Sequence, residues 1–205
     1  MVVINVRSQK TQTSSISKQI IKSINIMIRV LIPLFEGFEE IEAITVIDVL
    51  RRGEIEVVTA GLVTTTVMGA HAIAIIADTL LEQVDASQFD AIVLAGGAGT
   101  FRLREDPRIA KILIDYAAAN KLVAAICAAP TVLSAAGLLK DKRATSYPSV
   151  KDEMQVAEYL TIPVVVDGNV VTSRGAGTAM AFALKLVEIL KGEAIANQLA
   201  TDMIV

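Results

Sequence analysis

The only cysteine of this 205-residue chain joins two segments of different character. Residues 122–126 are all apolar, which is typical of a buried strand in a parallel sheet, because both faces of such a strand are covered. Residues 128–136 have the composition of a helix, with Pro130 in its first turn and Gly137 after its end. A strand, the nucleophile Cys127 and a helix in direct succession form the pattern of a nucleophile elbow.

An elbow of this kind would make Cys127 chemically reactive. Unpaired N–H groups and the positive end of a helix favour the thiolate over the thiol. The alternative is that Cys127 is a small apolar core residue, as many single cysteines are. The local pattern leaves both interpretations open.

Two further segments that could take part in chemistry follow the ends of predicted strands. Glu39, Glu40 and Glu42 come after the first strand, and Gly96-Gly97 follows a middle strand. Ligands of open parallel sheets bind at these carboxyl ends, where glycines let backbone N–H groups approach an oxyanion. A carboxyl group buried beside a thiolate would stay protonated and donate a hydrogen bond to the sulfur. The ordinary alternatives are a solvated first helical turn for the glutamates and a simple turn for the glycines.

These residues would be positioned by alternating strands and helices. Apolar periodicity and stop signals predict strands at residues 28–34, 54–60, 67–76, 90–94, 122–126 and 143–147, and a β-hairpin at 163–172. They predict helices at residues 39–52, 107–120, 128–136, 150–159, 178–191 and 193–203, and a helical turn at 78–84. This order indicates a three-layer α/β sandwich with a mostly parallel central sheet.

The first 26 residues differ from the rest of the chain. They carry four basic residues and no acidic one, and they lack the long apolar segment of a secretory signal. We predict that residues 1–26 are a poorly ordered extension and that residues 27–205 form one domain. We expect a cytoplasmic protein, or an organelle-targeted one if residues 1–26 are a transit peptide.

Composition argues against several classes of protein. A net charge of −3 gives no broad case for nucleic-acid binding, and no apolar run reaches membrane-spanning length. One cysteine cannot form an internal disulfide, and with one histidine it cannot make a zinc site of the usual kind. Neither Gly-x-Gly-x-x-Gly nor Gly-x-x-x-x-Gly-Lys occurs, so nucleotide binding has little support. We expect no cofactor and no metal. We expect His71 to be a surface or hydrogen-bonded histidine.

Five motifs in order give a more specific indication. They are Gly37-Phe-Glu-Glu-Ile-Glu42, Leu94-Ala-Gly-Gly97, Ala125-Ile-Cys-Ala-Ala-Pro130, Ala144-Thr-Ser-Tyr-Pro148 and Thr172-Ser-Arg-Gly-Ala-Gly-Thr178. Together they resemble the ThiJ/PfpI superfamily, in the branch of the Parkinson-disease-associated protein deglycase and YajL-like proteins. The resemblance covers residues 27–205.

The resemblance implies a flavodoxin-like fold, a homodimer and a reactive cysteine. It implies Cys127 as the catalytic thiol, Glu42 as its protonated partner, and the N–H groups of Gly97 and Ala128 as donors to the sulfur. It also implies a candidate substrate pocket that includes Gly96, Tyr147, Pro148 and Arg174.

Two classes of function follow from the resemblance. The first is a cofactor-free glyoxalase III or protein deglycase, of lyase or hydrolase class, acting on methylglyoxal and its early adducts on proteins. The second is an oxidative-stress sensor or chaperone that works through oxidation of Cys127, without significant turnover. Protease-like members have His after the cysteine, where this chain has Ala128, so we expect no protease. Some deglycase-branch proteins have His where this chain has Tyr147, which leaves proton transfer to Glu42 or Cys127.

Overall fold

A computed structural model describes residues 27–205, so the predicted N-terminal extension lies outside the described residues. A seven-stranded sheet forms the centre, in the order β10-β11-β7-β6-β1-β2-β5. All neighbouring strands are parallel except β10 and β11, which form the predicted late hairpin. The strands are β1 (Arg29–Leu34), β2 (Glu56–Gly61), β5 (Thr79–Leu80), β6 (Ala91–Leu94), β7 (Leu122–Ile126), β10 (Val164–Asp167) and β11 (Val170–Ser173).

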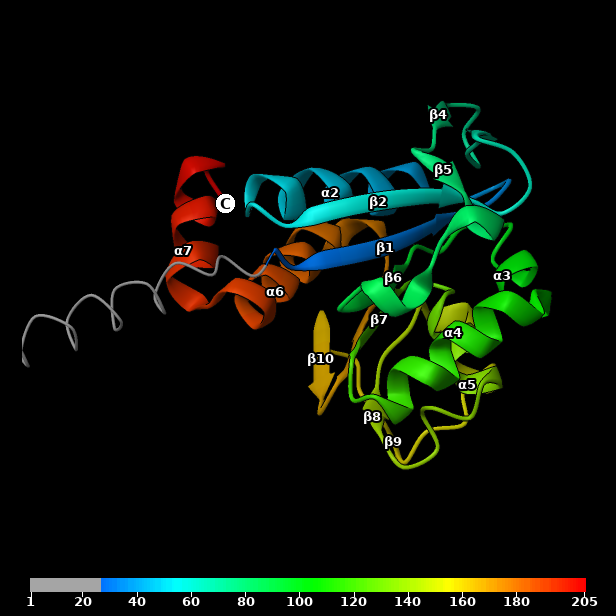
Figure 1. Ribbon diagram of the computed structural model, residues 1–205. Coiled ribbons are helices and arrows are strands. Elements are labelled where there is room, and N and C mark those ends of the chain that lie inside the picture. The colour runs from blue at the N-terminus through cyan, green and yellow to red at the C-terminus, as the bar shows by residue number, and fades with distance from the viewer. Residues whose placement is uncertain (1–26) are drawn as a thin grey trace, which may run out of the picture.

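Helices cover both faces of the sheet (Figure 1). α2 (Glu40–Arg52) and α6 (Ala179–Lys191) pack together on one face, and α7 (Glu193–Asp202) packs on α6. α3 (Phe101–Glu105), α4 (Pro107–Ala118) and α5 (Pro130–Ala135) lie together, with α4 and α5 against β7. The predicted three-layer sandwich with a mostly parallel sheet is therefore confirmed.

The middle of the sheet is the core of the domain. Every residue of β6 and β7 is buried, as are the last five residues of β1. Strands with both faces covered need apolar side chains throughout, which is why these segments have no alternation of polar and apolar residues. Because β7, β6 and β1 are adjacent and parallel, their carboxyl ends meet at one edge.

The strand predicted at residues 67–76 is wrong. The segment forms a small antiparallel hairpin of β3 (Thr66–Met68) and β4 (Ala74–Ile76), and His71 lies in the connection between them. Backbone bonds from Gly37 N to the Met68 carbonyl and from Ala70 N to the Phe38 carbonyl hold this hairpin beside the turn after β1. The apolar run conceals a turn because Gly69 and Ala70 are small and apolar rather than polar.

The segment after α5 also differs from prediction. Residues 143–147 give only the two-residue β8 (Arg143–Ala144), which pairs with β9 (Glu158–Tyr159) outside the central sheet. The helix predicted at 150–159 is wrong, because residues 148–153 form a 3-10 helix and the chain then leaves it. Three further 3-10 turns occur at Leu81–Gln83, Ala86–Gln88 and Ala176–Thr178, and the first of these lies in the predicted helical turn at 78–84. Among residues 27–205 no helix is both long enough and apolar enough to span a membrane.

Candidate active site

Three neighbouring strand ends supply the candidate active site. β1 leads through a turn to α2, which carries Glu42 two residues after its first residue, Glu40. β6 leads to Gly96 and Gly97, and β7 leads directly to Cys127. The strand order therefore brings together three segments of the chain, and Glu42 in the first lies more than 80 residues before Cys127 in the last.

Cys127 has the backbone of a nucleophile elbow. Its φ angle is 65°, in the left-handed region that a non-glycine residue rarely adopts. The turn is held from both sides, because Cys127 N donates to the Ser173 carbonyl at 3.0 Å and Tyr147 N donates to the Cys127 carbonyl at 2.7 Å. The helix α5 begins at Pro130 rather than directly after the cysteine, so residues 127–129 form a separate turn.

Glu42 is fully buried beside this turn. Its Oε2 accepts a hydrogen bond from Gly96 N at 2.8 Å, and its Oε1 has no hydrogen-bond partner among the described residues. A buried carboxylate with an unpaired oxygen is costly, and a protonated carboxyl removes that cost because its O–H can donate. Burial raises the pKa of Glu42 to about 7, against the lowering effect of the neighbouring Cys127 thiol and of the hydrogen bond from Gly96 N.

Gly96 allows the thiol and the carboxyl to approach each other. A Cβ at Gly96 would lie 2.7 Å from the Cβ of Cys127 and 2.9 Å from Oε2 of Glu42. Gly97 has a φ of 116°, and a Cβ there would lie 2.4 Å from the Gly37 carbonyl oxygen. Only glycine fits at these two positions, so the Gly-Gly pair is more than an ordinary turn.

The charge state of the thiol depends on its neighbour. Burial raises the pKa of Cys127 to about 12, and the negative charge of an ionised Glu42 contributes to this rise. The N–H groups of Ala128 and Gly97 act in the opposite direction. Beside an ionised Glu42 the sulfur is therefore a thiol at neutral pH, which differs from the thiolate expected from the sequence. A thiolate requires that the proton shared by the pair resides on Glu42.

A cavity of about 570 Å³ opens above Cys127. Glu42, Gly97, Ala128 and Tyr147 are among its lining residues, all of them singled out in the sequence. Other lining residues are Glu39, Ala98, Thr100, Phe101, Arg104, Thr131, Ser149, Val150, Glu153 and Ala176. The volume exceeds that of a three-carbon dicarbonyl several times over, so larger groups also fit.

The other predicted pocket residues have different positions. Gly96 lies beneath the thiol, and Pro148 starts the 3-10 helix whose residues Ser149, Val150 and Glu153 line the cavity. Arg174 does not line the cavity, although the next residue, Gly175, lies close to both the Tyr147 ring and the sulfur.

Sequence reasoning missed Arg104, which pairs with Glu153 at the cavity wall. The short helix α3 that carries Arg104 has too few residues to show a period.

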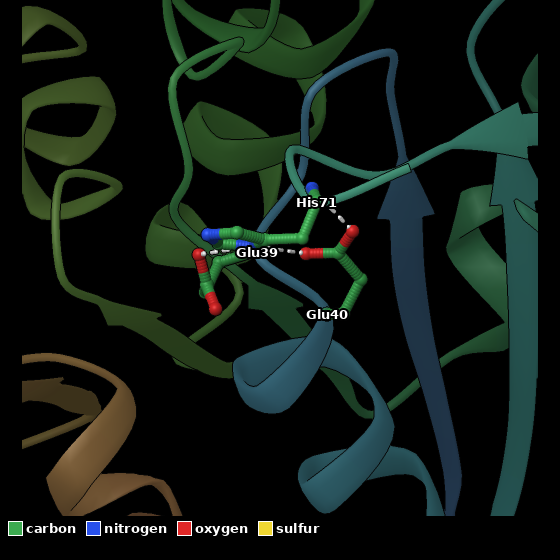
Figure 2. A group of neighbouring side chains, drawn as sticks. All are labelled: Glu39, Glu40 and His71. Carbon is green, nitrogen blue, oxygen red and sulfur yellow. Dashed lines mark hydrogen bonds and ion pairs between the residues drawn. The ribbon is translucent and has the colours of Figure 1, made fainter. Parts of the chain in front are cut away.

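His71 lies beside the glutamates at the start of α2 (Figure 2). Its Nδ1 is 2.8 Å from Oε2 of Glu40, and its side chain is 68% exposed. The expectation of a surface, hydrogen-bonded histidine is therefore confirmed. His71 lies far from the motifs in the sequence, so its place beside the glutamates could not be predicted. The β3–β4 hairpin sets that place.

The fold and the site define a class of protein: a flavodoxin-like α/β sandwich with a cysteine at a nucleophile elbow and a buried glutamate beside it. Residues 28–189 match the DJ-1/PfpI family, and the chain belongs to that family. The crystal structure of Drosophila melanogaster DJ-1beta superimposes with a TM-score of 0.84 at 40% sequence identity, over 88% of this chain and 99% of that one.

Two curated relatives have names that state an activity. The glutathione-independent glyoxalase DJR-1.2 of Caenorhabditis elegans is 42% identical over 80% of this chain and 89% of its own length. A deglycase of Pyrococcus abyssi is 36% identical over 80% of this chain and 99% of its own. The chain spans about half or less of two Arabidopsis thaliana relatives, DJ-1 homologs A and B, covering 46% and 41% of their lengths at 41% and 37% identity.

Proposed function

We propose that this protein is a cofactor-free glyoxalase III or protein deglycase acting on methylglyoxal and its early adducts on proteins. The observation that carries the proposal is the unpaired Oε1 of buried Glu42 beside the half-buried thiol of Cys127, at the base of an open cavity. Relatives named as a glyoxalase and a deglycase support the same chemistry. We further propose that the protein acts as a cytoplasmic homodimer with a single domain at residues 27–205.

Hydrogen-bond donors favour placing the single negative charge of the pair on sulfur. Two N–H groups, from Ala128 and Gly97, face Sγ, whereas the Glu42 carboxyl receives one N–H, from Gly96. A proton on the Glu42 carboxyl would remove the cost of its unpaired oxygen and would let the carboxyl act as a third donor to the sulfur. The reactive form is therefore thiolate with neutral Glu42.

The first step is addition. The Cys127 thiolate forms a bond to the aldehyde carbon of methylglyoxal, the C=O electron pair moves to oxygen, and Glu42 gives its proton to that oxygen. The product is a hemithioacetal, and Glu42 is now a carboxylate able to act as a base.

The second stage is isomerisation and hydrolysis. Glu42 takes the proton of the former aldehyde carbon, and the released electron pair forms an enediolate with the neighbouring ketone. Return of the proton to the neighbouring carbon, with transfer of the hydroxyl proton to its oxygen, gives a lactoyl thioester. Water cleaves the C–S bond, which releases lactate and restores the shared proton, so no oxidant or reductant is consumed.

Lactate formation from methylglyoxal tests the proposal. Wild type should form lactate, Cys127→Ser should form none, and Glu42→Gln should lose turnover because its amide donates a hydrogen bond but transfers no proton. Glu193→Gln on exposed α7 is the matched control and should match wild type. Full activity in Cys127→Ser would refute the proposal.

A second function has its own supporting observation. The thiol is half-buried and lines an open cavity, so peroxide can reach it, and oxidation to sulfinate would place negative oxygen next to the N–H groups of Ala128 and Gly97. A protein that protects clients from aggregation only after this oxidation, and forms no lactate, would be the redox sensor or chaperone.

A further inference from the structure

A second group of ligating side chains lies at the start of α2, separate from the Cys127–Glu42 pair. Glu39, Glu40 and His71 each place one potential ligand atom within 4.8 Å of the other two. Nδ1 of His71 lies 2.8 Å from Oε2 of Glu40 and 3.6 Å from Oε2 of Glu39 (Figure 2). The chemistry proposed for Cys127 uses none of these three side chains.

Backbone groups fix the orientation of Glu40. Its side chain is only 5% exposed, and its Oε1 accepts the N–H of His71 at 2.6 Å and that of Ile73 at 3.4 Å. A Cβ at Gly69 would lie 2.3 Å from Oε1, so the β3–β4 connection encloses the carboxylate as closely as glycine allows. Metal-binding carboxylates are oriented by outer hydrogen bonds in the same way. Oε2 is left to face the imidazole.

The cluster lacks a permanent positive charge. Within residues 27–205, the ion pairs of Glu39 and Glu40 are with His71, and no Lys or Arg pairs with either. A buried carboxylate needs a partner of opposite charge. The first turn of α2 and the backbone N–H groups of His71 and Ile73 stabilise the Glu40 carboxylate in part, and a proton on His71 or a bound metal ion would supply a full positive charge.

We propose that Glu39, Glu40 and His71 form a divalent metal site suited to Zn²⁺. Zn²⁺ binds imidazole nitrogen and carboxylate oxygen at about 2.0–2.2 Å, so the ligand atoms of a tetrahedral site lie about 3.3 Å apart. The two distances from Nδ1, 2.8 and 3.6 Å, lie on either side of that value. Sequence reasoning discounted zinc because it counted only histidine and cysteine.

Three protein ligands leave one coordination position open. The largely exposed side chain of His71 gives solvent access to it, and Glu39 also lines the cavity above Cys127, so the metal would lie at the edge of that cavity. The site is independent of the proposed thiol chemistry, because it needs neither Cys127 nor Glu42.

Titration calorimetry with Zn²⁺ tests the site in the full, untagged chain carrying Cys127→Ser. His71 is the only histidine and Cys127 the only cysteine of the sequence, so this background retains a single imidazole and no thiol. We expect one Zn²⁺ per chain, weakened at least about tenfold by His71→Ala and by Glu39→Gln. Glu193→Gln, on exposed α7, is the matched control and should leave the affinity unchanged.

Two further measurements separate ligand loss from damage to the fold. Without metal, the melting temperatures of His71→Ala and Glu39→Gln should be close to that of the Cys127→Ser background. Zn²⁺ should raise the melting temperature only where the site is intact. Co²⁺ should give a visible absorption band that His71→Ala removes.

Absence of saturable Zn²⁺ binding below about 1 mM would overturn the proposal. Unchanged binding in either His71→Ala or Glu39→Gln would overturn it as well. Lactate formation has no bearing on these results, so failure of the metal site and failure of the proposed enzyme are distinguishable.

Discussion

Gly96→Ala tests whether the thiol and the carboxyl are as closely packed as the account requires. The added Cβ would lie 2.7 Å from the Cβ of Cys127, 2.9 Å from Ala128 N and 2.9 Å from Oε2 of Glu42. None of these neighbours can move easily, because Glu42 is fully buried and residues 127–129 form a turn held by backbone hydrogen bonds. Inserting a methyl group into such packing typically costs about 1–3 kcal/mol.

The assay combines thermal unfolding with lactate formation. For a domain of this size, each kcal/mol lowers the melting temperature by about 2–4 °C, so Gly96→Ala should lower it by about 2–12 °C. Lactate formation should also fall, because the displaced Glu42 carboxyl no longer meets Sγ.

Gly177→Ala is the matched control for this prediction. A Cβ there meets no atom within 4 Å, so the melting temperature should change little. If Gly96→Ala has the melting temperature and the rate of lactate formation of wild type, the close packing of thiol and carboxyl is refuted.

Three other predictions concern stability and assembly. Asp106 caps α4 by accepting from Arg108 N, so Asp106→Ala should lower the free energy of unfolding at pH 7 by about 1 kcal/mol in urea titrations. The hydrogen bond from the Arg108 side chain lowers the pKa of Asp106 from its ordinary value of 3.8. The stabilisation by Asp106 is therefore fully present above about pH 4 and is lost as the pH falls through the folded-state pKa. A difference from wild type that does not shrink as the pH falls below about 4 would contradict this. Deleting residues 1–26 should leave the melting temperature almost unchanged, and a large loss would show that they pack on the domain. Light scattering at micromolar concentration should give about twice the 21.8 kDa of one chain, and a clean monomer would contradict the homodimer.

The sequence predicted the strands and helices whose own residue pattern matches their burial or capping in the fold. β6 and β7 are continuous apolar runs because both faces are buried, and Asp106-Pro107 starts a helix because one residue caps it and the other fits its first position. Parallel strand ends meet at one edge, so Glu42, Gly96 and Cys127 could be grouped before their distances were known.

The remaining features depend on tertiary contacts that have no local signal. The turn at Gly69–Ala70 is fixed by hydrogen bonds to Phe38 and Ile73, so nothing in its composition separates β3 from β4. The same hairpin brings His71 to the glutamates. The pKa of Cys127 depends on its burial and on the charge of Glu42. The spacing of residues in the sequence gives the size of neither effect.

The pH dependence of Cys127 alkylation by iodoacetamide tests the central claim, that the pair shares one proton with the charge on sulfur. As the only cysteine in the chain, Cys127 is the only thiol that the reagent can report. A thiolate beside a neutral Glu42 should be alkylated rapidly between about pH 5 and pH 8, below the pKa of a free thiol. This reactivity should be retained in Glu42→Gln and shifted to higher pH in Glu42→Ala. Alkylation of wild type only in strongly alkaline solution, as the pKa of about 12 beside an ionised Glu42 would give, would contradict it.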